Sequence, residues 1–284
     1  MGLVLNTNVS SLIAQRNLWN NSRAVSSSFE KLSSGLRINR AADDAAGLSI
    51  SETLRTQIRG NQKAVSNAQD GVNTLQIAEG ALSVIGDNLQ RIRELTIQAA
   101  NDTNSTIERN AIALEVQSRL DDIDRIANST RSSNIKLLDG KKTDYILQIG
   151  ANSVDTENTL DIGDVFLSAQ SEALGISTTV TASGTGAYIS NGSCRSFLGE
   201  IDNALEEVNT RRAQLGALQN RLDSTIESLS IAVENLKATN SRIRDLDIAS
   251  ESAILTKNQI LQQSALSVLA QANQSPTLAL QLLQ

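Results

Sequence analysis

The stretch VSNAQDGVNTLQIAEGALSVIGDNLQRIRELTIQA, Val65 to Ala99, decides the fold class. Its apolar residues recur in steps of three and four: Val65, Ala68, Val72, Leu75, Ala78, Leu82, Ile85, Leu89, Ile92, Leu95 and Ala99. This spacing predicts one continuous amphipathic helix, because it keeps the apolar side chains on a single face. A helix from about Asn61 to Asn101 would be ~60 Å long at ~1.5 Å per residue. Most helices of globular proteins are much shorter.

Two more stretches have the same periodicity. After the turn sequence NDTNS, Asn101 to Ser105, a second helical pattern runs through Ile112, Val116, Leu120, Ile123 and Ile126. The third stripe comprises Ile201, Leu205, Val208, Leu215, Leu218, Leu222, Ile226, Leu229, Val233, Leu236, Ile243 and Leu246. The sequence therefore predicts a mainly α fold, a long antiparallel helical bundle or coiled coil formed by the N- and C-terminal halves.

The middle of the chain has a different character. YILQIG, Tyr145 to Gly150, and NTLDIG, Asn158 to Gly163, alternate apolar and polar residues on either side of a polar stretch, which predicts a small central β-hairpin. The stretch from Ser177 to Ser193 is rich in Ser, Thr and Gly and predicts an exposed loop or tip.

The composition narrows the function classes. A net charge of −6 and a pI near 4.9 argue against a nucleic-acid partner, which needs a basic surface. The chain has no histidine and a single cysteine, Cys194, so His-based acid–base catalysis, Cys-His nucleophiles and His/Cys metal sites are excluded. We expect no metal, no cofactor and no enzymatic activity. No secretory signal peptide and no membrane-spanning stretch is expected either.

Both ends of the chain lack charge. Met1 to Gln15 contains no charged side chain, and none follows Lys257. One interpretation is that the two ends pair and dock on a core of the same chain. The other is that they pair and bury their remaining surface against neighbouring copies, which the absence of charge on every face favours. The apolar residues expected in this assembly are Leu12, Trp19, Phe29, Leu261, Leu269, Leu278 and Leu282.

Motifs at both ends resemble those of bacterial flagellin, the subunit of the flagellar filament. The resemblance covers roughly the first 140 residues and the last 90. The motifs are LNTN (5–8), LSSGLRINRAADDAAGLSIS (32–51), NAQDGVNTLQIAEGAL (67–82), LQRIRELTIQAAN (89–101), SRIRDLDIASES (241–252), TKNQIL (256–261) and LAQANQSP (269–276). The chain departs from the family at RSSNIKLL, Arg131 to Leu138, at Trp19 and at Cys194.

The resemblance implies a domain architecture and a route of export and assembly. Residues 1–42 with 246–284 would form an inner helical coiled-coil domain, and residues 43–175 with 194–245 a helical bundle with the β-hairpin. Residues 176–193 would form a short tip in place of outer domains. The protein would be exported by the flagellar type III apparatus with an export chaperone and would self-assemble into the extracellular filament, in contact with flagellar cap and junction proteins. Ser and Thr between Ser177 and Ser193 are candidates for O-linked sugars.

Charged residues gather where the two layers would meet. We expect Arg37, Arg40, Asp43, Asp44, Arg244 and Asp247 to form a charge network that joins the layers. The alternative is an ordinary solvated linker. Asp43 or Asp44 would also cap the helix that follows.

The segment LQRIRELTIQAAN also resembles the region of flagellin that Toll-like receptor 5 recognises. Matched residue by residue, the receptor contacts fall on Arg91, Leu95 and, on the second helix, Glu115. The alternative is that these residues serve only the packing of the bundle and of neighbouring subunits.

Two other functions compete with a filament subunit. A hook–filament junction protein would share the terminal architecture, but the LAQANQSP ending argues against it. A soluble helical receptor-binding module would not need termini that lack charge on all sides.

Overall fold

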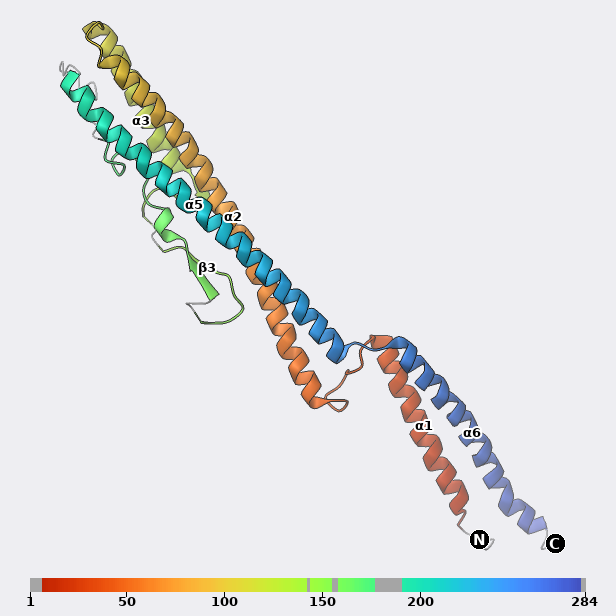
Figure 1. The fold of residues 1–284 in the computed structure, drawn as a ribbon. Helices are drawn as coiled ribbons and strands as arrows, with labels where there is room; N and C mark the ends of the chain where they lie inside the picture. The colour runs from red at the N-terminus through yellow and green to blue at the C-terminus, as the bar shows by residue number, and fades with distance from the viewer. Residues whose placement is uncertain (1–6, 142–143, 155–157, 177–190, 282–284) are drawn as a thin grey trace. The chain divides into compact units, whose positions relative to one another are not determined.

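The computed structural model describes residues 7–141, 144–154, 158–176 and 191–281. Five long helices contain most of these residues, and Figure 1 shows them as coiled ribbons: α1 (Val9–Ser34), α2 (Ala45–Ala99), α3 (Thr106–Ser129), α5 (Asn191–Arg244) and α6 (Ile248–Gln281). The predicted mainly α fold is confirmed. Most of the predicted Ser/Thr/Gly tip, residues 177–190, lies outside the described residues.

Helix α2 is longer than the periodicity predicted. It begins at Ala45, whereas the apolar stripe suggested a start near Asn61. The side chain of Asp44 explains the earlier start, because its Oδ1 accepts a hydrogen bond from the Gly47 amide at 2.9 Å and so caps the first turn. Asp44 was one of the two predicted caps. The predicted end is close to the observed one at Ala99.

Helix α3 starts with a capping box. The Ser105 hydroxyl accepts from the Glu108 amide, and the Glu108 carboxylate accepts from the Ser105 amide at 2.7 Å. The Glu108 pKa is lowered, mainly by this backbone hydrogen bond. The turn before it, predicted from NDTNS, is thereby confirmed.

The chain divides into two compact units, and the larger comprises residues 59–233. Its core runs along α2, α3 and α5, which Figure 1 shows side by side. The largest buried side chains from α2 and α3 are Leu75, Leu82, Ile85, Leu89, Ile92, Leu95 and Ile123. Helix α5 adds Ile201, Val208, Leu215 and Leu222. The predicted lengthwise bundle is confirmed.

Two short antiparallel hairpins lie in the same unit. Strands β3 (Ile146–Gln148) and β4 (Thr159–Asp161) form the predicted hairpin, with Leu147 opposite Leu160. Strands β1 (Arg131–Ser132) and β2 (Ile135–Lys136) form a second one, which was not predicted. Its two turn residues, Ser133 and Asn134, both have positive φ, as a tight hairpin turn requires.

The segment after β4 contributes buried side chains to the core of this unit. It includes the short 3-10 helix η1 (Gly163–Val165) and the fully buried Phe166, whose ring lies 4.8 Å from that of Tyr145. Phe197 on α5 is buried too. The remaining fully buried side chains of this core are mainly aliphatic.

The smaller unit comprises residues 1–58 and 234–284. Within it α1 and α6 pack along each other in opposite directions. Asn8 Nδ2 donates to the Ala272 carbonyl at 2.7 Å near one end of the pair, and the Leu246 amide donates to the Gly35 carbonyl at 3.0 Å near the other. Gly35 ends α1 with φ 69°, a left-handed conformation that glycine adopts without strain. The predicted pairing of the two ends of the chain is therefore present within one molecule.

Candidate functional site

Helix α1 leaves much of its apolar surface in solvent. Its exposed large side chains are Val9, Leu12, Ile13, Trp19 and Phe29, each between 46% and 59% exposed. Ala14 and Ser28, by contrast, are buried. Three of the predicted assembly residues, Leu12, Trp19 and Phe29, are therefore on the exposed surface.

Helix α6 has the same character. Ile254, Ile260, Leu261, Leu266 and Val268 are between 41% and 58% exposed. Among the predicted assembly residues, Leu261 is exposed and Leu269 is half-buried. Leu278 belongs to α6 but its side chain is outside what the structure describes, and Leu282 lies outside the described residues.

Charge is sparse on this helix pair. Helix α6 contains no charged residue after Lys257, and the basic residues Arg16 and Arg23 are on α1. The guanidinium of Arg23 lies 4.7 Å from the centre of the Trp19 ring, a cation–π contact. Exposed apolar side chains gathered on one helix pair with few charges among them are typical of an interaction site.

The six residues of the predicted charge network have other partners than expected. Arg37 donates to the Ile243 carbonyl at 2.6 Å, and Arg40 pairs with Glu30 at 2.7 Å. Asp43 accepts from the amides of Asn39 and Arg40, and the Arg40 amide is the main cause of its lowered pKa. Asp44 caps α2.

Asp247 likewise serves as a cap, accepting from the Ala249 and Ser250 amides at the start of α6. None of the ion pairs found in the described residues joins two of the six predicted residues. Each of the six instead contacts the backbone or a carboxylate that was not predicted.

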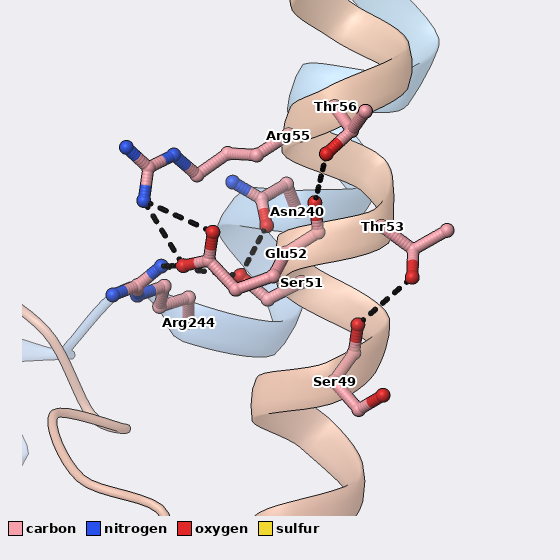
Figure 2. A network of polar contacts seen from close by, with 8 residues as sticks. All are labelled: Ser49, Ser51, Glu52, Thr53, Arg55, Thr56, Asn240 and Arg244. Carbon is pink, nitrogen blue, oxygen red and sulfur yellow. Dashed lines mark hydrogen bonds and ion pairs between the residues drawn. The ribbon is translucent and has the colours of Figure 1, made fainter.

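A further ion pair in this region joins α5 to α2. Arg244 Nη1 lies 2.7 Å from Glu52 Oε1, and the Arg244 side chain is only 15% exposed. Figure 2 shows Arg55 reaching the same carboxylate, at 3.0 Å. Arg244 is the main cause of the lowered Glu52 pKa. Beside this pair the buried Ser51 hydroxyl donates to Asn240 Oδ1 at 2.8 Å.

Four residues that make polar contacts in this region were not predicted: Glu30, Ser51, Glu52 and Asn240. The sequence offers a weak signal for Ser51 alone, because it falls seven residues before Ile58 on the buried face of α2. Nothing in one sequence indicates that Glu52 meets a residue 192 positions away.

The three predicted receptor contacts are divided between surface and core. Arg91 pairs with Glu94 at 3.0 Å and with Glu115 on α3 at 3.4 Å. Both carboxylates raise the pKa of Arg91, and the largest contribution is the hydrogen bond that Arg91 donates to Glu94. Arg91 and Glu115 remain about half exposed. Leu95 is 2% exposed and belongs to the core, so its side chain is not offered to a partner.

Other candidate chemistry is limited. Cys194 is buried in the core of the larger unit, and burial raises the pKa of its thiol, which disfavours a reactive thiolate. Across the described ranges no cluster of three or more acidic, Cys or His side chains has the arrangement of a metal site. No helix within those ranges combines the length and the apolar character that crossing a membrane requires.

Comparison with protein families gives two matches that together span most of the chain. The bacterial flagellin N-terminal helical region matches residues 5–143, and the bacterial flagellin C-terminal helical region matches residues 198–283.

Several known proteins match along their whole length. Flagellin from Halalkalibacterium halodurans is 43% identical, with 99% of this chain and 100% of that protein covered. Flagellin from Bacillus subtilis is 41% identical, with 99% of each chain covered. The flagellar filament 33 kDa core protein of Treponema phagedenis is 41% identical over 99% of this chain and 100% of its own.

Comparison with solved structures gives a similar fold in one case. A protein from Vibrio parahaemolyticus described as a flagellar hook-associated protein superposes with a TM-score of 0.55 at 14% identity, covering 72% of this chain and 98% of its own. Bacillus cereus flagellin gives a TM-score of 0.47 at 26% identity, covering 58% of this chain and 88% of its own. The first likeness concerns the fold alone.

Proposed function

The chain belongs to the bacterial flagellin family, and from this premise we propose that it polymerises by burying the exposed apolar side chains of α1 and α6 against neighbouring copies. Members of this family are structural proteins, not enzymes, and form the flagellar filament. The chain is accordingly a filament subunit that serves motility.

The polymerisation mechanism rests on one observation. The paired helices α1 and α6 leave large apolar side chains exposed to water, because neither helix covers them. Ile260 and Val268 on α6 are 58% and 55% exposed, and Leu12 on α1 is 57% exposed. Fully burying one such side chain contributes roughly 1.5–3 kcal/mol. Because no charge follows Lys257, neighbours can close around α6 without desolvating an ion.

We also propose that the subunit is divided into an inner and an outer layer. Residues 1–42 with 246–284 would form the inner layer, and residues 43–175 with 194–245 the layer outside it. The hydrogen bond from Arg37 to the Ile243 carbonyl would then join the two layers. The pair Arg40–Glu30 would lie within the inner layer and the pair Arg244–Glu52 within the outer one, on either side of this connection. The predicted six-residue network is thereby replaced by pairs that include Glu30 and Glu52.

The remaining partners follow from the same premise. Export through the flagellar type III apparatus would deliver the chain outside the cell, and a chaperone would cover the apolar face of α6 until then. Cap and junction proteins would meet the ends of the filament. Recognition of the monomer by Toll-like receptor 5 would use Arg91 and Glu115, which are exposed, and not the buried Leu95.

The proposal is tested by seeded polymerisation followed by electron microscopy and pelleting. The full chain is compared with a chain that lacks residues 258–284 and with the full-length double variant Ile260→Gln/Val268→Gln. The matched control is Ile107→Gln, which alters a side chain that is 80% exposed on α3. We expect filaments from the full chain and the control only.

The other outcomes are equally informative. Filaments from the truncated chain would mean that the tail docks within its own subunit, and the proposal would be wrong. If even the full chain failed to polymerise from seeds, the role of a hook–filament junction protein would replace that of a propagating subunit.

A further inference from the structure

Helix α1 carries a cationic stripe on the side that faces away from its buried residues. Leu12, Arg16, Trp19 and Arg23 follow one another at helical spacing and are all exposed. Buried Ala14 and Ser28 fall on the opposite side of the same helix. We call Arg16, Trp19 and Arg23 the α1 stripe.

The α1 stripe has no acidic partner among the described residues of its own molecule. In the described part of the chain neither Arg16 nor Arg23 forms an ion pair, and Arg23 rests on the Trp19 ring. The helix that packs along α1 cannot supply a carboxylate there, because α6 is uncharged after Lys257. Two arginines would be costly to bury in the assembly without a counter-charge.

Helix α5 carries an acidic stripe with the matching spacing. Glu227, Ile231 and Glu234 are exposed, and Ile231 is 54% exposed. We call these three residues the α5 stripe. They lie on the opposite side of α5 from the buried Leu222 and Val233. The structure shows no ion pair to either glutamate from a described residue, and Asp223 adds a like charge four residues before Glu227, which is unfavourable in a helix.

The spacings fit in one direction better than in the other. Arg16 and Arg23 are seven residues apart, as are Glu227 and Glu234, which is about 10.5 Å along a helix. Trp19 is three residues from Arg16, and Ile231 is three residues from Glu234. An antiparallel arrangement therefore matches Arg16 with Glu234, Trp19 with Ile231, and Arg23 with Glu227.

The charges of the chain agree with this pairing. Residues 59–233 contain 15 basic and 23 acidic residues, a net charge of −8, whereas residues 1–58 and 234–284 together contain 10 basic and 8 acidic residues, a net charge of +2. Glu227 belongs to the acidic range and Glu234 is the first residue after it. An acidic surface on one copy would attract the cationic helix of another.

We propose that the α1 stripe of one copy docks antiparallel on the α5 stripe of a second copy. This inference rests on the proposed function, since it names one contact of the polymer. Because the stripe on α1 and the stripe on α5 are different surfaces, the contact is heterologous and can propagate along a filament.

The test is a charge exchange. Three full-length chains are compared with the unmodified protein: Arg16→Glu/Arg23→Glu, Glu227→Arg/Glu234→Arg, and all four changes together. The critical concentration for seeded polymerisation should rise about tenfold, ~1.4 kcal/mol, in each double variant. It should return to within about threefold of the original value in the quadruple variant, where both charges are restored with opposite sign. The control Arg131→Glu/Arg195→Glu changes the net charge by the same amount as Arg16→Glu/Arg23→Glu, on other exposed residues, and should leave the critical concentration unchanged.

A second measurement does not depend on these variants folding normally. Trp19→Cys/Ile231→Cys filaments are treated with a short bis-maleimide, and cross-linked dimers and longer ladders are expected. Trp19→Cys paired with Asn220→Cys, a position elsewhere on α5, should give none. The buried Cys194 is replaced by Ser in both chains.

The results separate this contact from the wider proposal. An unmodified chain that does not polymerise would contradict the filament function itself. Polymerisation that is unaffected by either double variant would overturn the stripe contact and leave the function intact. An unaffected critical concentration together with a loss of binding to phosphatidylglycerol vesicles in Arg16→Glu/Arg23→Glu would assign the α1 stripe to an anionic lipid surface instead.

Discussion

The ion pair between Arg244 and Glu52 joins the last residue of α5 to the first turns of α2, at 2.7 Å. The two side chains differ in exposure to solvent: Arg244 is 15% exposed and Glu52 is 49% exposed. Within the smaller unit the pair stands beside the buried hydrogen bond from Ser51 to Asn240.

The pair makes the stability of this region depend on pH. The hydrogen bond from Arg244 lowers the pKa of Glu52 below its ordinary value of 4.5 in the folded protein. The stabilisation is therefore present above the unfolded-state pKa and is lost as the pH falls through the lower, folded-state pKa. We expect Glu52→Gln to lower Tm at pH 7, and the difference from the unmodified protein to vanish below the folded-state pKa.

Thermal unfolding followed by circular dichroism at pH 7 and pH 2.5 measures this difference. Asp122→Asn is the control, because its partner Arg125 is three residues away on the same helix and 69% exposed. Such exposed pairs contribute little. An equal Tm loss for Glu52→Gln at both pH values would show that the ion pair is not the cause.

The Ser51 hydroxyl should matter independently of pH. Ser51 is fully buried, and its removal in Ser51→Ala leaves Asn240 Oδ1 without its 2.8 Å hydrogen bond. A lost buried hydrogen bond costs on the order of 1–3 kcal/mol. Hydrogen exchange of the amides in residues 45–58 should speed up accordingly, whereas Ser49→Ala, which alters an exposed neighbour, should have no effect. Unchanged protection in Ser51→Ala would contradict this role.

The sequence predicted the regular part of the fold well. Apolar steps of three and four identified α2, α3 and α5, because burial of one face dictates both the spacing and the helix. The hairpin of β3 and β4 was visible in the alternation around Leu147 and Leu160. The hairpin of β1 and β2 was missed, since strands of two residues are too short to show a period.

Contacts between residues that are distant in the sequence could not be predicted. Arg211 looks like an ordinary charge on a helix, yet its side chain is 6% exposed, donates to the carbonyls of Leu167 and Ser168, and pairs with Glu207. For the candidate site, the absence of charge at both ends led to α1 and α6, where Leu12, Trp19 and Leu261 are exposed. The sequence could not assign partners to Arg40 or Arg244, because a salt bridge depends on side-chain geometry that no local pattern encodes.

The core of the larger unit should respond strongly to lost volume. Leu89 on α2 is fully buried, and Leu89→Ala should cost about 2–5 kcal/mol of unfolding free energy. Ile77 on the same helix is 43% exposed, so Ile77→Ala is the matched control and should cost well below half as much. Urea unfolding at pH 7 measures both. Equal losses would mean that the helical stripe does not define the core.

The capping box of α3 provides a local test. Ser105→Ala removes the hydroxyl that accepts from the Glu108 amide, and a lost cap of this kind costs about 0.5–2 kcal/mol. Ser105→Asp should retain most of the stability, because a carboxylate also accepts at this position. Urea unfolding compares the two variants. A destabilisation by Ser105→Asp as large as that by Ser105→Ala would show that the capping hydrogen bond is not responsible.

Glycine at position 150 should be required by the β3–β4 hairpin. A Cβ added there would lie 2.6 Å from Asn158 Cγ, and Asn158 cannot swing away because its buried side chain bonds to both Val154 and Asn152. We expect Gly150→Ala to cost about 1–3 kcal/mol through overpacking. Gly80→Ala is the control with the opposite sign, because a Cβ at this exposed position of α2 meets no atom. Alanine there should stabilise the helix by about 0.5–1 kcal/mol. Urea unfolding of the two variants checks both signs, and a neutral Gly150→Ala would show that the loop relaxes around the added methyl group.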